Sequence, residues 1–169
     1  MNGINILKDV LKLQLKVVFC GTAAGNKSAE IKAYYAGRGN KFWNTIYEAK
    51  IVDKLIDPVD YKSLLDYNIG LTDMAKFAYG NDSDINRSDY DIESLLVKIK
   101  KYKPKMICFN GKNAGKVFYN KKFIEYGLQP DECYNTKIFI APSTSGAANG
   151  FWNINYWHEL SSVLNGYEK

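Results

Sequence analysis

Three short apolar runs divide the chain, and each ends in a turn residue or a small residue. They cover residues 15–21, 106–111 and 137–142. The runs are rich in β-branched and aromatic residues and are shorter than an ordinary helix, a combination typical of strands buried on both faces of a parallel sheet. The pattern therefore predicts three buried parallel strands.

The segments around these runs have a helical period instead. Apolar residues recur at helical spacing over residues 42–49 and 92–99. A third helix is expected over residues 57–66, where Pro58 suits the first turn because its missing N–H has no partner there. A fourth helix is expected over residues 155–164. Strands and helices therefore alternate along the chain.

This alternation predicts one α/β domain over residues 1–169, with three layers and a short, mostly parallel central sheet. Ligands of such sheets bind at the carboxyl ends of the strands. That rule selects the loops over residues 21–40 and 141–151. Residues 70–88 are a third candidate loop, since the stretch 80–84 is polar and is expected to be flexible.

Composition adds a charge to this picture. The chain has 169 residues, with 23 Lys and Arg against 18 Asp and Glu, and a formal net charge of +5. A basic surface suits a polyanion, because each cation placed near a phosphate releases condensed counterions. The basic runs 100–103 and 121–122 are equally typical of ordinary solvated faces, so charge alone leaves a nucleic-acid partner open.

The three cysteines, Cys20, Cys108 and Cys133, are odd in number and contain no C-x-x-C pair. This argues against a disulfide framework, a zinc site or an iron–sulfur cluster, and we expect no metal and no cofactor. No apolar stretch approaches the length of a transmembrane helix. We therefore expect a cytoplasmic protein that has no membrane partner and acts as a monomer.

The turn after the first apolar run admits two interpretations, of which the first is a phosphate-binding P-loop. Residues 21–28 nearly match G-x-x-x-x-G-K-[ST], with Lys27 and Ser28 in place. However, Asn26 stands where the pattern has a glycine, and the other predicted strands do not end in the Asp that helps to hold magnesium. A P-loop nucleotide-binding protein stays open as an alternative.

The second interpretation rests on four motifs that follow one another at matching spacing. They are the glycine turn of residues 21–25, the aromatic and small residues that lead into N-K-F-W at residues 34–43, the landmarks at residues 65–72 and 110–112, and the P-S-T-S turn at residues 142–145. Together these motifs resemble the uracil-DNA glycosylase superfamily, in its mismatch-specific branch. The P-S-T-S form is closest to the hypoxanthine-DNA glycosylase branch. The resemblance covers about residues 9–160.

This resemblance implies a monofunctional DNA glycosylase that excises hypoxanthine or uracil from double-stranded DNA. Such an enzyme flips the target base out of the stack into a pocket and hydrolyses its N-glycosidic bond. The chemistry needs a positioned water and stabilisation of the leaving base, and it needs no metal. No lysine stands out as a Schiff-base nucleophile, so cleavage of the DNA strand is not expected.

The resemblance also implies the residues of a base pocket. Tyr35 occupies the position at which the family stacks an aromatic ring on the flipped base, although a core tyrosine is the alternative. The backbone amides of Thr22 and Ala23 are expected to contact the edge of the base. His158 is expected to be structural, because Ser143 occupies the position at which some family members have a histidine.

The catalytic position departs from the family. Much of the family has, at the position of Ala23, the Asn that positions the hydrolytic water, and alanine cannot do this. In the hypoxanthine-specific branch the Asn of the N-K-F-W motif is implicated, which is Asn40 here. Asn40 also suits a helix N-cap, and one amide does not easily fill both roles. A catalytically inactive, nucleic-acid-binding relative therefore stays open as an alternative.

The resemblance places the DNA-binding residues in the last loop. The expected contacts to the DNA backbone and to the vacated stack are Ser143, Thr144, Ser145, Gly146, Ala147 and Lys112. The family often has a bulkier wedge in this loop, so insertion into the stack is either shallow or completed by Phe151. A plain Ser- and Gly-rich turn is the alternative for this segment.

Overall fold

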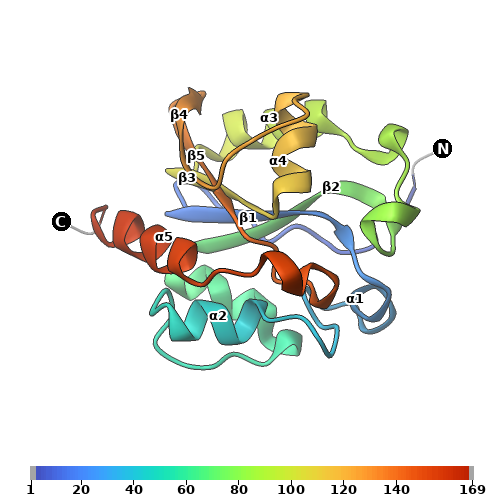
Figure 1. Cartoon of the computed structure of the whole chain (residues 1–169), viewed down its shortest axis with the longest axis horizontal. Helices are drawn as coiled ribbons and strands as arrows, with labels where there is room; N and C mark the ends of the chain where they lie inside the picture. Colours follow the sequence, from blue (N-terminus) through green and yellow to red (C-terminus); the bar gives the residue numbers. More distant parts are fainter. Residues whose placement is uncertain (1–2, 168–169) are drawn as a thin grey trace.

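One sheet organises the computed structural model, which describes residues 3–167 (Figure 1). Its strands lie in the order β2-β1-β3-β5-β4. They are β1 (Val17–Ala24), β2 (Ile69–Tyr79), β3 (Met106–Asn110), β4 (Gly127–Cys133) and β5 (Thr136–Ala141). All neighbours pair in parallel except β4, which is antiparallel to β5. The three strands predicted from the apolar runs are β1, β3 and β5, and their parallel arrangement is confirmed.

Helices cover both faces of this sheet. They are α1 (Asn26–Ile31), α2 (Phe42–Glu48), α3 (Ile92–Tyr102), α4 (Lys112–Tyr119) and α5 (Asn155–Asn165), with the 3₁₀ helices η1 (Pro58–Tyr67), η2 (Asp82–Asp84), η3 (Arg87–Asp89) and η4 (Gly146–Phe151). The four predicted helices correspond to α2, η1, α3 and α5. The Asp57 carboxylate caps η1 by accepting a hydrogen bond from the Val59 N–H at 3.0 Å. Within residues 3–167, no helix is long and apolar enough to cross a bilayer.

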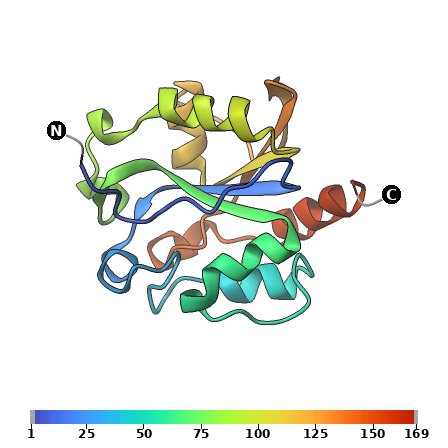
Figure 2. The same cartoon turned by 180° about the vertical axis from the view of Figure 1, so that it is seen from behind.

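The layers are clear when the molecule is seen from both sides (Figures 1 and 2): α3 and α4 cover one face of the sheet, and α2, η1 and α5 cover the other. The core divides accordingly. On the first face Ile107 and Phe109 pack with Leu95 of α3. On the second face Phe19 packs with Phe42 of α2 and Trp157 of α5. The predicted three-layer α/β fold is confirmed.

Residues 70–79 correct the predicted loop over residues 70–88. They belong to β2, whose first eight residues are buried. The sequence obscured this strand because the polar residues Thr72, Asp73 and Lys76 interrupt its apolar pattern. Residues 80–88 lie outside the strand, and they include η2 and the start of η3.

A buried charge cluster makes these polar residues tolerable in β2. The Asp9 carboxylate lies 2.8 Å from the ammonium groups of both Lys76 and Lys98 and accepts a hydrogen bond from the Thr72 hydroxyl at 2.7 Å. Burial acts to raise the pKa of Asp9, but Lys76 and these hydrogen bonds outweigh it and hold that pKa below its usual value. Lys76 also donates to the Tyr34 hydroxyl at 3.1 Å. The cluster therefore ties β2 to the N-terminal segment and to the loop before α2.

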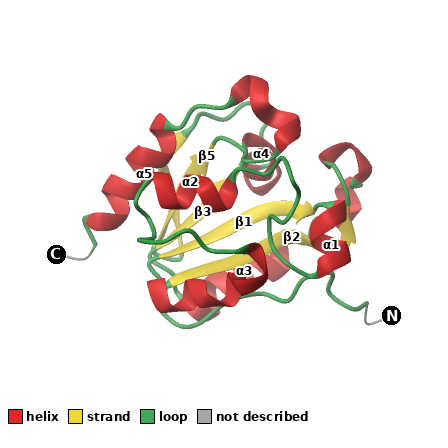
Figure 3. Ribbon diagram, turned by 90° about the horizontal axis from the view of Figure 1, so that it is seen from below, coloured by secondary structure: helices red, strands yellow, loops and turns green. Residues whose placement is uncertain are grey.

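Three further elements were not predicted, for local reasons. The predicted loop of residues 21–40 contains the last part of β1 and the short α1, and Figure 3 shows α1 beyond the end of β1. In α4, Gly115 breaks the apolar pattern because its Cα packs against Ile140, where an added Cβ would lie 2.6 Å from the Cδ1 atom. The edge strand β4 contains Pro130, which edge strands tolerate since they have an unpaired side.

Candidate functional site

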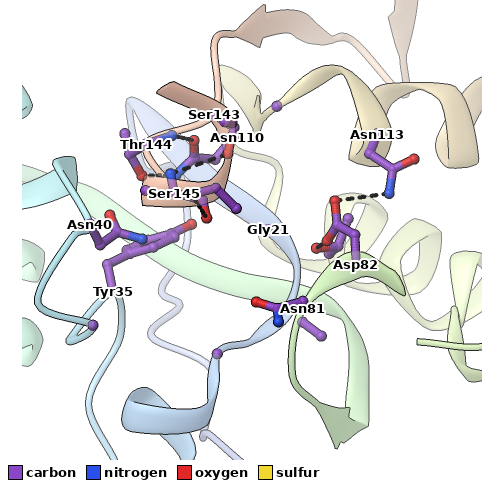
Figure 4. Close-up of a pocket in the computed structure, with 18 of the residues that line it drawn as sticks. Gly21, Tyr35, Asn40, Asn81, Asp82, Asn110, Asn113, Ser143, Thr144 and Ser145 are labelled. Carbon is purple, nitrogen blue, oxygen red and sulfur yellow. Dashed lines mark hydrogen bonds between the residues drawn. The ribbon is translucent and has the colours of Figure 1, made fainter. Parts of the chain in front are cut away.

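A cavity of about 680 Å³ opens at the carboxyl ends of β1, β3 and β5 (Figure 4). Its lining comes mainly from residues 21–28, 34–40, 80–82, 110–113 and 143–148, together with Asp73, Lys116, Tyr126 and Phe151. The sequence rule that ligands bind at this edge of a parallel sheet selected the first and last of these segments. The cavity therefore joins loops that lie far apart along the chain.

The closed end of the cavity is formed where β1 and β2 pair. Gly21 lies opposite Asp73 in the parallel register. An added Cβ at Gly21 would lie 2.7 Å from the Asp73 Oδ1 atom and 3.5 Å from the hydroxyl oxygen of Tyr35. Both polar groups therefore lie over the Cα atom of Gly21, which only glycine allows.

Asp73 is the one carboxyl group at this closed end among the described lining residues, and the sequence analysis missed it. Asp73 is 5% exposed, and no described residue donates a hydrogen bond to its carboxylate. Burial raises the pKa of Asp73 to about 6, while Lys76 and Lys98 lower it and Asp9 raises it. A charged residue in the otherwise buried stretch 69–76 was the signal that could have identified it, since unpaired carboxylates are rarely buried.

Tyr35 forms a wall of the cavity. One ring face stacks on Phe42, with the ring centroids 4.1 Å apart and the planes 28° apart. Its backbone has a left-handed φ of 53°, which is uncommon for a residue other than glycine. Its hydroxyl is buried without a hydrogen-bond partner among the described residues, and burial, followed by Asp73, raises its pKa well above the usual value. The ring is thus partly core and partly cavity lining.

Asn40 lines the same cavity, and its side chain bonds to the backbone at the start of α2, although the N-cap residue of that helix is Lys41 and not Asn40 as the sequence suggested. The Asn40 Oδ1 atom accepts a hydrogen bond from the Phe42 N–H at 3.0 Å, at the start of α2. Among the described residues, none accepts a hydrogen bond from the Asn40 Nδ2 atom. Only the nitrogen end of this amide is therefore free toward the cavity.

The loop after β5 is held by a pair of hydrogen bonds between two side chains and the backbone. The Asn110 Nδ2 atom donates to the Thr144 hydroxyl at 2.9 Å, and the Thr144 N–H donates to the Asn110 Oδ1 atom at 3.0 Å. The Thr144 carbonyl in turn accepts from the Lys41 N–H at 2.8 Å. Thr144 is completely buried, so it positions the loop and has no surface to offer to DNA. Asn110, which the sequence gave only as part of the landmark at residues 110–112, links β3 to this loop.

The remaining residues of the loop are more accessible. The Ser143 and Ser145 hydroxyls accept hydrogen bonds from the backbone N–H groups of Ser145 and Ala147, at 3.2 and 3.3 Å. Because a hydroxyl that accepts can still donate its proton, both remain able to bind an anion. Gly146 packs backbone to backbone against Gly39, where an added Cβ would lie 3.2 Å from the Gly39 carbonyl oxygen. Phe151, at the end of η4, is 76% exposed at the cavity.

The opposite side of the cavity is closed by Asp82. Its carboxylate accepts from the Thr22 hydroxyl at 2.6 Å and from the Asn113 Nδ2 atom at 3.0 Å. Thr22 and Ala23 lie on the last part of β1, where the pairing register with β2 shifts after Ala23. Ala23 offers no polar side-chain atom. The clamp around Asp82 joins β1, η2 and α4, and the sequence analysis did not identify it.

Lys112 lies at the start of α4, with its ammonium 4.3 Å from the centroid of the Tyr126 ring and 3.7 Å from the Glu125 carboxylate. This keeps the cation beside the cavity. Lys27 and Ser28, the two residues that suggested a P-loop, have partners within the protein. Lys27 pairs with Glu30 at 3.1 Å, and the buried Ser28 hydroxyl accepts from the Ala36 N–H at 3.0 Å.

No group of three or more His, Cys, Asp or Glu side chains within residues 3–167 could hold a metal ion. His158 is exposed on α5 and does not line the cavity. The groups available to a ligand are therefore an aromatic ring, a buried carboxyl, amides and hydroxyls.

Comparison with known proteins agrees with this arrangement. A family model described as the uracil DNA glycosylase superfamily matches residues 8–161. Among solved structures, the chain is similar to the solution NMR structure of a candidate uracil DNA glycosylase from Methanosarcina acetivorans. The TM-score is 0.62 and the identity 21%, over 96% of this chain and 97% of that one. This structural likeness concerns the fold.

The raised pKa of Asp73 predicts a pH-dependent stability. Between about pH 4 and pH 6 the unfolded chain releases this proton while the fold retains it, so the free energy of unfolding falls as the pH rises. The loss is at most about 3 kcal/mol, at about 1.4 kcal/mol per pKa unit. Asn does not titrate, so the stability of wild type relative to Asp73→Asn should fall across this window and level off above it.

Urea denaturation of both proteins at several pH values from about 4 to 8 measures this difference. Asp131→Asn, which changes an exposed carboxyl on β4, is the matched control and should show no such dependence. A stability difference between wild type and Asp73→Asn that stays constant with pH would show that Asp73 has an ordinary pKa.

Proposed function

Because the chain belongs to the uracil DNA glycosylase superfamily, we propose that it is a monofunctional DNA glycosylase that excises a deaminated base, hypoxanthine or uracil, from double-stranded DNA. The observation that carries this proposal is the cavity itself. It combines an aromatic wall, unpaired polar groups at its closed end and a hydroxyl-bearing loop at its mouth. A planar base with a polar edge matches this combination.

In this proposal the target base is flipped out of the duplex and stacks on the Tyr35 ring. Phe42 supports the ring from its other face, which keeps the stacking surface in place. Base–aromatic stacking contributes about 1–3 kcal/mol per base. This offsets part of the few kcal/mol needed to unstack a base, which is least for a mispaired or damaged one. Backbone amides of Thr22 and Ala23 are proposed to contact the base.

DNA binding is assigned to the loop after β5. The Ser143 and Ser145 hydroxyls would donate to phosphates on either side of the flipped nucleotide, and Lys112 would add a positive charge. Gly146 and Ala147 would approach the vacated position in the stack. Because these residues are small, the exposed Phe151 ring is the proposed wedge.

Hydrolysis needs a water held against the sugar carbon as the base departs and positive charge develops on the sugar. Ala23 lacks a polar side chain, so we assign the positioning of this water to Asn40. Its Oδ1 atom is bonded to the Phe42 N–H, so the contact to the water would come from the Nδ2 atom. If Asn40 does not act in this way, the chain is a relative that binds lesions without excising them, and Ala23 is the observation that favours this second candidate.

The proposed function is tested by incubating the protein with duplexes that contain a single hypoxanthine, uracil, xanthine or normal base. Abasic sites are measured by alkaline strand cleavage, with and without EDTA. We expect release of hypoxanthine or uracil, unaffected by EDTA, and no strand cleavage before alkali. Tight lesion binding without base release would favour the non-catalytic candidate, and reversible loss of activity with EDTA would contradict the metal-free chemistry.

Substitution of Tyr35 tests the stacking wall. Tyr35→Ala should weaken lesion binding or turnover by at least about fivefold, the lower limit for loss of one stacking contact. Tyr35→Phe keeps the stacking face and should cost less than about threefold. Tyr35→Leu keeps apolar bulk without the ring and should behave like Tyr35→Ala. If all four proteins are folded, as judged by their thermal unfolding, and have equal activity, then Tyr35 has a purely structural role.

Substitution of Asn40 separates catalysis from capping. Asn40→Ala should lower the single-turnover rate about 10²-fold, the effect of losing one positioned polar group in a preorganised site. It should lower stability by about 1 kcal/mol, as for loss of a cap. Asn40→Ser restores a capping oxygen but lacks the amide nitrogen, so it should recover the melting temperature and not the rate. Full recovery of both, or a wild-type rate for Asn40→Ala, would contradict the catalytic role.

A further inference from the structure

The Asp73 carboxyl lies at the closed end of the cavity, but neither the water-positioning role nor the stacking role described above uses it. We propose that Asp73 is a base-binding residue of this site and reads the Watson–Crick edge of the flipped base as a neutral carboxylic acid. This inference rests on the proposed function and names the chemical class of its substrate. That class is bases with a carbonyl next to a ring N–H, as in hypoxanthine and uracil.

The geometry brings the base edge to Asp73. The hydroxyl end of the Tyr35 ring and the Asp73 Oδ1 atom both lie over the Cα atom of Gly21. A base stacked on the Tyr35 ring and inserted to full depth therefore directs one edge at Asp73. Because Gly21 has no side chain, nothing from β1 separates the base from the carboxyl.

The carboxyl has no other partner to occupy it. No described residue donates a hydrogen bond to Asp73, and the adjacent Tyr35 hydroxyl is buried without a partner as well. The nearby Lys76 and Lys98 ammonium groups are both engaged 2.8 Å from Asp9. The buried Tyr35 hydroxyl is costly to leave unpaired, and a ligand that reaches it and the adjacent Asp73 carboxyl would supply the missing partners.

The protonation state decides which edge fits. A neutral acid has one O–H donor and one carbonyl acceptor side by side. The donor matches the base carbonyl, and the acceptor matches the adjacent ring N–H. An ionised carboxylate offers two acceptors and would repel the base carbonyl. The neutral form can therefore pair with the carbonyl and ring N–H of hypoxanthine or uracil, and the ionised form cannot.

The surroundings of Asp73 favour this neutral form. The titratable and charged groups that act on it or are acted on by it are Asp9 from the N-terminal segment, Cys20 on β1, Tyr34 and Tyr35 from the loop before α2, Lys76 on β2 and Lys98 on α3. Burial outweighs the two lysines and raises the pKa of Asp73 to about 6. A bound base that excludes water would favour the neutral acid further.

The pH dependence of kcat/KM tests this assignment, because kcat/KM reports the ionisation of the free enzyme. On uracil- and hypoxanthine-containing duplexes, kcat/KM should fall about tenfold per pH unit above about pH 6, as the neutral acid is lost. Asp73→Asn carries an amide whose donor and acceptor do not titrate. It should retain activity and remove this fall, so that it exceeds wild type at about pH 8.

Two further variants complete the experiment. Asp73→Ala leaves the base edge without a partner and should lose about tenfold or more at pH 6, mainly through binding of lesion DNA. Asp131→Asn removes an exposed carboxyl on β4 and should follow the wild-type profile. Circular dichroism melts check folding, and if Asp73→Ala does not fold, the wild-type and Asp73→Asn profiles decide alone.

The outcomes distinguish this inference from the proposed function. A wild-type profile that rises through pH 6, with Asp73→Asn inactive, would make Asp73 a general base and overturn the reading role. Wild-type activity with no difference among the Asp73 variants would overturn it as well. Failure of wild type to release any base at any pH would instead overturn the proposed function, and the reading role with it.

Discussion

The parallel register between β1 and β2 is the constraint on which the site depends. It sets Gly21 opposite Asp73, so that a buried carboxyl meets a position without a side chain. A shift of one residue would direct Asp73 to the other face of the sheet and close the cavity with a neighbouring side chain. Three residues further along β2, the Asp9–Lys76 pair neutralises the one buried ammonium of that strand. Strand pairing and charge pairing thus act on the same few residues.

This arrangement places polar groups where stability alone would favour apolar ones. The Asp73 carboxyl and the Tyr35 hydroxyl lie unpaired among buried residues, and the Tyr35 backbone has a left-handed conformation. Each feature costs free energy in the unliganded fold. They gather at the closed end of one cavity, which is the distribution expected when a ligand supplies the missing partners. Large aliphatic and aromatic side chains fill most of the core on both faces of the sheet.

The sequence predicted those parts of the fold whose own residues determine them. The runs that became β1, β3 and β5 are apolar almost throughout, and their period identifies them without any neighbour. By contrast, β2 contains the buried charged residues Asp73 and Lys76. The fold can bury them only because a residue distant in sequence pairs with the lysine and because the carboxyl lines a cavity. Likewise, the motifs identified Tyr35 and Asn40 with their expected roles, whereas the role of Asn110 became visible only when β3 and the loop after β5 came together. Local pattern cannot reveal a role that arises from long-range contacts.

The start of α2 connects the cavity to this scaffold. Phe42 supports the Tyr35 ring with its side chain and donates its N–H to the Asn40 Oδ1 atom. One residue before it, the Lys41 N–H holds the Thr144 carbonyl, and so the loop after β5. The Tyr35 ring, the Asn40 amide and the loop after β5 are therefore held by two consecutive residues at one helix end. Support of the helix end and positioning of a ligand need not compete in this geometry, because the hydrogen bond from the Phe42 N–H engages the Asn40 Oδ1 atom and leaves the Nδ2 atom available to the cavity.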